Sequence, residues 1–369
     1  MNHHLPVAMT LSLILAQPGW AQWRSQVRPT SQGTRNTGLM GGVRAEFWLP
    51  ADSGTRDVAA VMTEAGIGIR GSWQVVGSIE LANRWHGWRL AARVSGQRDA
   101  TFEYFGLGND TRSDRAAIPG AGDDYFRLVR RRYGGRISVG RQVVGPVSVA
   151  GWLGGVSAAF QAPPGRSQFE ADQGRFQRST DLQFGALVVV DSRDKVGDPS
   201  RGWFVESGIA SGTAARGYRR WITVARVYLP VAPGTIVAAR VGGAGRLSGT
   251  LPLDARFVLP LLEGDMAVLG GRDTFRGLQY QRLAGDGVLW ANLDVRQHLT
   301  RIRGREIRVL GFADAGRGFE NEPFRLGLRG LKLGWGLGVA LPTERSVAIL
   351  QASRGPDGVF ISGGLRWQF

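Results

Sequence analysis

Hydrophobic and polar residues alternate with a period of two along most of the chain, from about residue 39 to its last residue. In the segment 181–191, for example, Leu182 and Phe184 alternate with Asp181 and Gln183. Successive side chains of a β-strand point to opposite faces, so each such segment predicts a strand with one apolar and one more polar face. About sixteen segments follow this pattern, beginning near residues 39, 58, 71, 87, 123, 134, 146, 178, 201, 217, 234, 288, 304, 329, 345 and 358.

This pattern predicts an all-β protein, a transmembrane antiparallel β-barrel of about sixteen strands. Residues 39–369 would form the barrel. An even number of strands closes such a barrel, and a membrane requires closure because an open sheet edge leaves backbone groups unpaired. Tryptophan lies near many segment ends, as at Trp48, Trp85 and Trp203, which is typical of interfacial aromatic girdles.

Composition agrees with this fold class. Glycine is frequent, with 55 residues against 16 prolines, which favours tight strand packing over a disordered linker. Cysteine is absent, so the chain has no disulfide and no thiolate chemistry. Beyond the N-terminus no stretch of about 18 consecutive apolar residues occurs, so a helical membrane protein is not indicated.

The formal net charge of +16 comes almost entirely from arginine. One interpretation is nucleic-acid binding. The other is an arginine-rich barrel lumen together with contacts to anionic lipid headgroups. The arginines are spread singly along alternating segments and form no basic arm, which favours the second interpretation and argues against a nucleic-acid partner.

The N-terminus is typical of a secretory signal peptide. The apolar run Leu5–Ala16 precedes a small-residue cleavage site at Gly19–Ala21 and is too short to span a membrane. We expect residues 1–21 to be removed and residues 22–38 to form a short polar leader, disordered or held in the barrel mouth. Export and a β-barrel together predict the outer membrane of a Gram-negative bacterium, with outer-membrane lipid as a partner.

The last segment alternates most clearly, and Leu365, Trp367 and Phe369 share one face of the predicted strand. A last strand with a final aromatic residue, in a secreted protein, resembles the signal that the outer-membrane assembly machinery reads. That machinery is therefore an expected partner during biogenesis. The alternative is an ordinary strand of a β-sandwich that happens to end the chain.

Three connections between segments are long, at 98–122, 161–177 and 246–287. Loops of more than about 12–15 residues usually have a function or are disordered. The third one carries a glycine-rich motif, and a strand after it carries a second motif. Their residues are Gly270, Gly271, Arg276 and Gly277 in the loop, and Phe312, Asp314 and Gly316 in the strand.

With these motifs the chain resembles the outer-membrane assembly-factor superfamily, which includes BamA, TamA, FhaC-type secretion pores and the bacterial surface antigen family. The resemblance implies a loop between strands eleven and twelve that folds into the barrel. The family's loop tip continues with an aromatic residue, where this chain has Leu278. Asn292 and Asp294 resemble the family's Asn-x-Glu, shortened by one methylene.

Two further stretches fit the same family. Residues 105–110 resemble its Phe-Gly-x-Gly-Asn turn, and residues 191–202 resemble its Asp-x-Arg-Asp and Pro-x-Arg-Gly motifs. The ordered match extends over residues 102–369. Each stretch alone is weak, and their common order makes the resemblance specific.

The alternation around Asp314 predicts its surroundings. Phe312 and Asp314 fall on the face opposite Gly311 and Ala313, so the carboxylate should point into the lumen. A carboxylate in a partly desolvated site requires a cation, and Arg276 beside Gly277 could approach the wall closely. We therefore expect a loop lock between Arg276 and Asp314, and the alternative is a solvated arginine on an outer loop.

Several features of related proteins are missing. Fewer than twenty residues lie between Ala21 and the first predicted strand, so no polypeptide-transport-associated domain is expected there. The chain has no Gly-x-Ser-x-Gly nucleophile motif and no cluster with metal-ligand spacing. The sequence thus predicts no enzyme, no cofactor and no metal site.

The function that the sequence favours is the handling of polypeptides at the outer membrane, by insertion or translocation. A separate periplasmic partner protein or a substrate polypeptide would then be the binding partner. The alternative is a passive porin with an arginine-rich, anion-preferring lumen.

Overall fold

The computed structural model describes residues 23–34, 37–50, 58–85, 87–302, 304–343 and 346–369. The predicted signal peptide, residues 1–21, lies outside the described residues. Among the residues that are described, no helix is long and apolar enough to cross a membrane.

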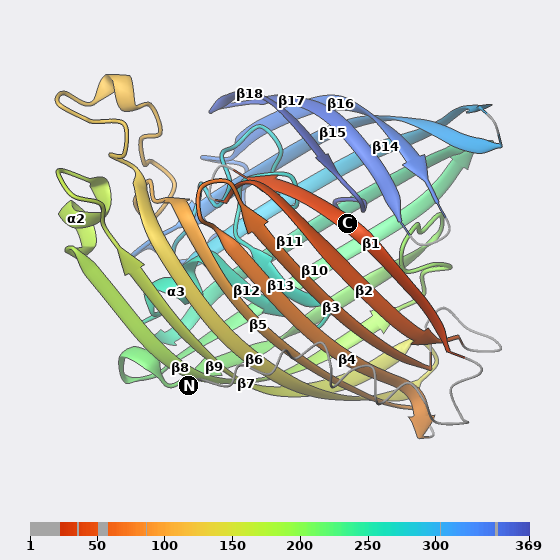
Figure 1. The fold of residues 1–369 in the computed structure, drawn as a ribbon. Helices are drawn as coiled ribbons and strands as arrows, with labels where there is room; N and C mark the ends of the chain where they lie inside the picture. Colours follow the sequence, from red (N-terminus) through yellow and green to blue (C-terminus); the bar gives the residue numbers. More distant parts are fainter. Residues whose placement is uncertain (1–22, 35–36, 51–57, 86, 303, 344–345) are drawn as a thin grey trace, which may run out of the picture.

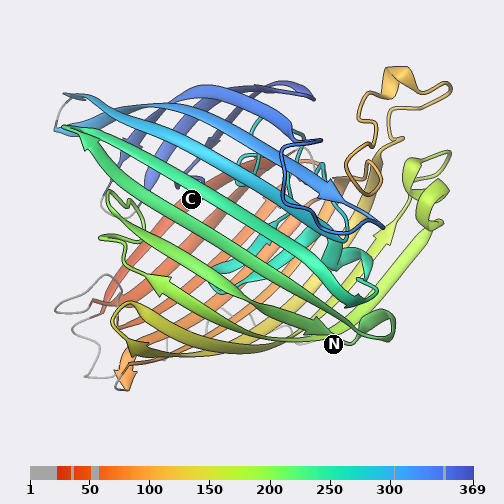
Figure 2. The ribbon, with the colours of Figure 1, turned by 180° about the vertical axis from the view of Figure 1, so that it is seen from behind.

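One antiparallel sheet of 16 strands curves into a barrel, as predicted (Figures 1 and 2). Its strands are β1 (Arg24–Thr34), β2 (Gly38–Leu49), β3 (Ala59–Gly68), β4 (Trp73–Trp85), β5 (Trp88–Glu103), β6 (Arg127–Val144), β7 (Val147–Gln161), β8 (Phe176–Asp191), β9 (Gly202–Gly212), β10 (Tyr218–Ala232), β11 (Thr235–Gly249), β14 (Gly287–Ile302), β15 (Arg305–Phe319), β16 (Lys332–Pro342), β17 (Val347–Gly355) and β18 (Gly358–Gly364). A separate hairpin consists of β12 (Val258–Leu261) and β13 (Gly264–Ala267), and the helices α2 (Gln168–Gln173) and α3 (Leu253–Phe257) are short.

The predicted alternation corresponds to the two faces of the barrel wall. On β8, Leu182 and Phe184 are about half exposed on the outer face, whereas Asp181 and Gln183 are buried on the inner face. An apolar outer surface is what a lipid environment requires of a transmembrane barrel.

The barrel begins earlier than predicted. Residues 24–34 form β1 and pair with β2, so the interpretation of 22–38 as a leader outside the barrel is wrong. The alternation of apolar and polar residues did not reveal this strand, because the segment is mostly polar and contains Pro29. Proline cannot donate a ladder hydrogen bond and is tolerated on an edge strand, which is the position of β1.

A second difference concerns the two segments predicted to begin near residues 123 and 134. They are one long strand, β6, whose inner face carries Arg130, Arg132 and Arg136. The arginines interrupt the alternation of apolar and polar residues in this strand, so the pattern predicted two strands in place of one. The predicted strand number nevertheless agrees with the structure, because one missed strand and one divided strand compensate.

The end of the chain also differs. The last strand, β18, stops at Gly364, and Trp367 and Phe369 are buried at 4% and 7% exposure. The expectation that the last strand runs to Phe369 is therefore wrong. Among the described residues no strand pairing joins β1 to β18, and these two strands are the edges of the sheet.

The connections 104–126, 162–175 and 250–286 lie toward one end of the barrel, called here the outer end (Figure 1). The third corresponds to the predicted long loop between the eleventh and twelfth sheet strands, β11 and β14. It contains α3 and the β12–β13 hairpin.

Candidate functional site

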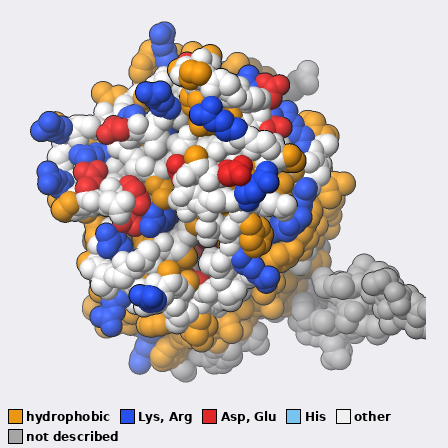
Figure 3. Space-filling model, turned by 90° about the vertical axis from the view of Figure 1, so that its left-hand side faces the viewer, with side chains coloured by type: hydrophobic (Ala, Val, Ile, Leu, Met, Phe, Trp, Pro, Cys, Tyr) orange, Lys and Arg blue, Asp and Glu red, His pale blue; other side chains and the backbone are white. Residues whose placement is uncertain are grey.

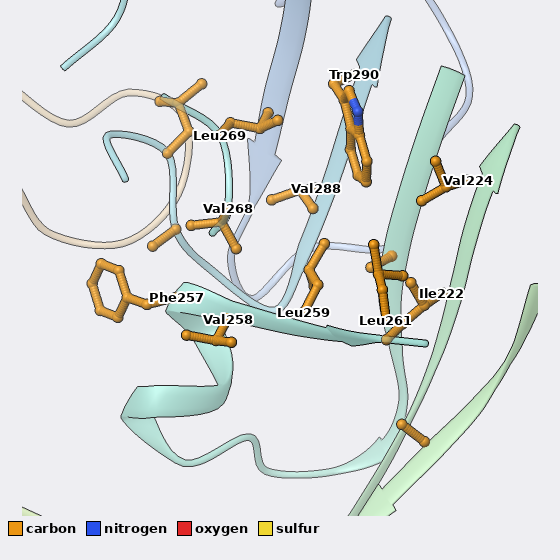
Figure 4. Close-up of a cluster of buried hydrophobic side chains, with 14 of the residues drawn as sticks. Ile222, Val224, Phe257, Val258, Leu259, Leu261, Val268, Leu269, Val288 and Trp290 are labelled. Carbon is orange, nitrogen blue, oxygen red and sulfur yellow. The ribbon is translucent and has the colours of Figure 1, made fainter. Parts of the chain in front are cut away.

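The loop 250–286, called here the lumen loop, folds into the barrel and forms much of its core. Leu259 and Leu261 of the hairpin join one buried cluster with Ile222 and Val224 of β10 (Figure 4). Val288 and Trp290 of β14 belong to the same cluster. Burial of apolar side chains contributes about 25 cal/mol per Å², so this packing holds the loop inside.

Arginines of the wall hold the first half of the lumen loop. Asp265 of the hairpin accepts a hydrogen bond from Arg132 Nη2 at 2.9 Å and forms an ion pair with Arg136. Arg132 Nε also donates to Asp254 at 2.9 Å. Arg220, which is buried, donates to the backbone carbonyls of Ala255 and Val258 at 2.6 and 2.9 Å.

Glu263 at the hairpin tip binds the next part of the wall. It accepts from Arg193 Nη2 at 2.7 Å and from Arg226 Nη1 at 2.8 Å. Arg193 belongs to the 191–202 motif, and it also forms a bidentate pair with Asp191. Many inward-facing arginines are therefore engaged with the lumen loop.

The predicted partners Arg276 and Asp314 are in contact. The guanidinium donates to both carboxylate oxygens, from Nε to Oδ2 at 2.9 Å and from Nη2 to Oδ1 at 2.7 Å. The backbone amide of Arg276 also donates to Asp314 Oδ2 at 2.7 Å. Arg276 Nη2 reaches a second carboxylate, that of Asp294, at 2.8 Å.

The surroundings of this contact are aromatic and buried. The Arg276 guanidinium carbon lies 3.6 Å from the centre of the Phe312 ring, which is within the range of a cation–π interaction. Asn292 donates to Asp314 Oδ1 and to the carbonyl of Thr274, each at 2.8 Å. The predicted strand motif and the Asn-x-Asp stretch therefore meet at one arginine.

The glycines of the loop motif lie where the backbone turns or touches the wall. Gly277 has a φ of +88°, and a Cβ there would come within 2.8 Å of the backbone of Arg354 on β17. Only glycine combines a positive φ with such a close approach without strain. Gly270 and Gly271 lie at the preceding bend, and Gly316 faces Leu269 and Phe275 of the loop.

The last residues of the chain reach the same region, which no sequence pattern indicated. The backbone carbonyl of Phe369 accepts from Arg296 at 3.1 Å, and that of Gln368 accepts from Arg240 at 3.3 Å. The centre of the Phe369 ring lies 4.8 Å from the guanidinium carbon of Arg240. The centre of the Trp367 ring lies 4.0 Å from the guanidinium carbon of Arg296.

Two further bonds fix these last residues, called here the tail (365–369). Trp367 Nε1 donates to Asp198 of the β8–β9 turn at 2.7 Å. Arg366 pairs with Asp273 of the lumen loop at 3.0 Å. Of the three residues predicted as an assembly signal, Trp367 and Phe369 face the lumen, and Leu365 remains 43% exposed.

The outer end of the barrel is covered by the 104–126 loop, which contains the 105–110 motif. Gly108 donates to the carbonyl of Ala284 at 2.7 Å, and Asn109 accepts from the amide of Gly318 at 3.3 Å. Asp357 of the β17–β18 turn accepts from Ser113 at 2.7 Å and from the Gln279 amide at 3.0 Å. Outer loops and lumen loop thus form one connected cap.

No protein-family model matches the chain, and no curated protein matches it. Among solved structures, BamA from Haemophilus ducreyi lacking POTRA domains 1–3 is similar, with a TM-score of 0.60 and 12% identity over 93% of this chain and 70% of that chain. CdiB from Escherichia coli gives a TM-score of 0.59 and 12% identity, over 94% of this chain and 63% of its own. CdiB from Acinetobacter baumannii gives 0.53 and 11%, over 92% and 58%.

The chain therefore spans less than two thirds of the length of either CdiB. At such identities the similarity concerns the fold alone. The barrel fold that the motif resemblance implied is confirmed, and this chain has the fold of the BamA and CdiB barrels.

Proposed function

We propose that this protein is an outer-membrane barrel that handles polypeptides, by inserting them into the membrane or translocating them across it. A separate periplasmic protein would deliver the polypeptide, and no catalytic chemistry is involved. This function is supported by the family resemblance of the motifs and by one feature of the sheet. That feature is the pair of free edges at β1 and β18, called here the seam.

An unpaired strand edge is a template for another strand. Within a membrane, pairing of a strand edge is strongly favoured, because no water is present to form hydrogen bonds with exposed backbone groups. β1 and β18 are not paired with each other among the described residues, and β18 has only 7 residues. A client strand that adds to the β1 edge would gain backbone hydrogen bonds without opening any existing ladder.

The lumen loop supports this proposal over the porin alternative. A passive porin requires an open lumen, whereas here a buried hairpin is bound to the wall through Asp265 and Glu263. Wall arginines that would select anions in an open pore are occupied by these carboxylates. The two functions therefore differ in the conductance that they predict.

A photocrosslinking experiment tests the proposal at the seam. A photoreactive amino acid replaces Val27 on β1, which is 67% exposed, or Val241 on β11, which is 55% exposed and lies far from the seam in strand order. Each variant is reconstituted in vesicles and receives one urea-unfolded eight-stranded barrel protein as client. We expect a crosslink from position 27 during client insertion and none from position 241.

Equal crosslinking at both positions, or none at position 27 while the client inserts at its uncatalysed rate, would contradict the proposal. Large, steady, anion-selective conductance of the same preparation in planar bilayers would favour the porin instead.

A further inference from the structure

The connection between β15 and β16, residues 320–331, lies against the outside of the barrel wall near β11 and β14 (Figure 2). The ring of Phe324 meets the ring of Trp221 edge-on, with centroids 4.7 Å apart. Trp221 alternates on β10 with the buried, inward-facing Arg220 and Ile222, so its ring is on the outer face. Phe324 is therefore packed on the lipid-facing side.

Two neighbours confirm this placement. A Cβ on Gly243, an outward position of β11, would come within 2.8 Å of Trp221 and 3.4 Å of Phe324. The ring of Phe319, at the end of β15, lies 4.9 Å from that of Phe324 between centroids. The Arg317 guanidinium lies over the Phe319 ring, 4.7 Å from its centre. Since Arg317 also pairs with Glu322 at 3.0 Å, the start of the connection is fixed to the outer wall.

Beyond this anchor the chain presents an amphipathic strip. Leu326 and Leu328 are 81% and 87% exposed, and Arg325 and Arg329 flank them. Residues 323–332 contain no aspartate or glutamate. Within the described part of the chain, the guanidinium groups of these two arginines form no ion pair.

The strip continues into the apolar belt of the barrel. On β16, directly after it, Leu333, Trp335 and Leu337 are 60–67% exposed on the outer face. Figure 3 looks onto the outer end of the barrel, where Lys and Arg side chains stand around the rim. Apolar side chains at the membrane surface with cations beside them are the arrangement that binds anionic lipid.

We propose that residues 323–332 bind a phosphorylated, acylated lipid of the outer leaflet. Arg325 and Arg329 hold its phosphates, for which the guanidinium fork is suited. Leu326 and Leu328 enter the acyl region, and this burial removes their exposed apolar surface from water. The inference needs the outer-membrane location and is independent of polypeptide handling.

The test uses the full-length barrel purified in detergent, with bisphosphorylated lipid A as the probe. Binding is measured by native mass spectrometry for the parent protein, for Arg325→Gln/Arg329→Gln and for Leu326→Ser/Leu328→Ser. The control is Lys195→Gln/Arg201→Gln, which removes the same charge from exposed side chains of the β8–β9 turn at the other end of the barrel. Equal heat-shift behaviour on gels verifies that every variant is folded.

We expect the arginine variant to bind lipid A about 30-fold more weakly, from the usual contribution of two surface cations. The leucine variant should also bind more weakly, and the control should bind as the parent does. Dephosphorylated lipid A and inorganic phosphate should each bind poorly, because each lacks one half of the ligand.

Unchanged affinity in the arginine variant would overturn the proposal. Equal binding of the dephosphorylated lipid would do the same, as would equal loss in the control. Strong binding of inorganic phosphate alone would also contradict the proposal, because it would show that these residues form a simple anion site and not a lipid site. Client crosslinking at position 27 can succeed or fail independently of each of these results.

Discussion

The guanidinium of Arg276 donates hydrogen bonds to both carboxylate oxygens of Asp314, although the two residues are 38 positions apart. Their side chains are 1% and 0% exposed. A buried, bidentate ion pair is expensive to break on one side, because the remaining charge has lost both water and its partner. The lumen loop is therefore held to the wall at this point.

The first prediction concerns this pair. Arg276→Ala should destabilise the folded barrel by on the order of 3–5 kcal/mol, the range for breaking a buried pair. Asp314→Ala should cost less, because Arg276 retains the carboxylate of Asp294 at 2.8 Å. The double variant should be no worse than Arg276→Ala. Heat-shift temperature, loop proteolysis and conductance measured as a double-mutant cycle provide the check.

The exposed pair Arg115–Asp123, with side chains 44% and 86% exposed, is the matched control. Its removal should have almost no effect, since exposed pairs contribute little. Strictly additive effects of the Arg276 and Asp314 substitutions would show that their contact is not energetically coupled.

The second prediction concerns the approach of the loop to β17. Gly277→Ala combines a strained positive φ with a clash against Arg354 and should release the loop tip to protease. Gly165→Ala is the control, because Gly165 has a φ of +95° and no neighbouring atom within 4 Å of its added Cβ. Equal effects in the two variants would assign the cost to φ strain alone.

The third prediction concerns the tail. Phe369→Ala removes the ring that lies over Arg240 and that packs with Tyr228 at 6.5 Å between centroids. A lost cation–π contact costs roughly 0.5–2 kcal/mol, and lost burial adds to it. We expect less folded barrel in the membrane and greater exposure of the tail to carboxypeptidase.

Arg296→Gln separates two explanations of that result. It leaves the last residue intact but removes the charge that lies over Trp367. If the tail acts by packing in the lumen, Arg296→Gln should also expose it. If Phe369 is only a signal for the assembly machinery, Arg296→Gln should leave tail exposure unchanged.

The fourth prediction concerns the hairpin. Asp265→Asn and Glu263→Gln together remove the carboxylates that bind Arg132, Arg136, Arg193 and Arg226. Loss of these contacts should loosen the hairpin. We expect the parent, whose lumen is filled by the loop, to show only small conductance in planar bilayers, and the double variant to show larger, anion-selective steps. Glu170→Gln on α2, which pairs with Arg175 in an outer loop, is the control and should conduct like the parent. An unchanged conductance in the double variant would mean that apolar packing alone holds the hairpin.

The fifth prediction concerns location. The protein should be found in the outer-membrane fraction without residues 1–21, and its gel mobility should change on boiling. N-terminal sequencing of the recovered protein decides the cleavage site. Recovery from the cytosol with Met1 retained would contradict the outer-membrane assignment.

Sequence alone was sufficient for most of the strands, because alternation is a local property that each strand carries in its own residues. It also indicated Asp314 as a lumen residue, since Phe312 and Asp314 share the face opposite Gly311 and Ala313. The pattern failed where the wall itself is polar. β1 and the arginine-rich part of β6 have no apolar alternation to detect.

Only the tertiary structure decided which charges meet. Arg193 and Glu263 are 70 residues apart, and nothing local in either segment specifies the other. The tail shows the same limit for apolar residues. Trp367 and Phe369 leave water whether they face lipid or the packed lumen, so their hydrophobicity cannot indicate the side of the wall. These two side chains face the lumen because their partners Arg240, Arg296 and Asp198 lie inside the folded barrel.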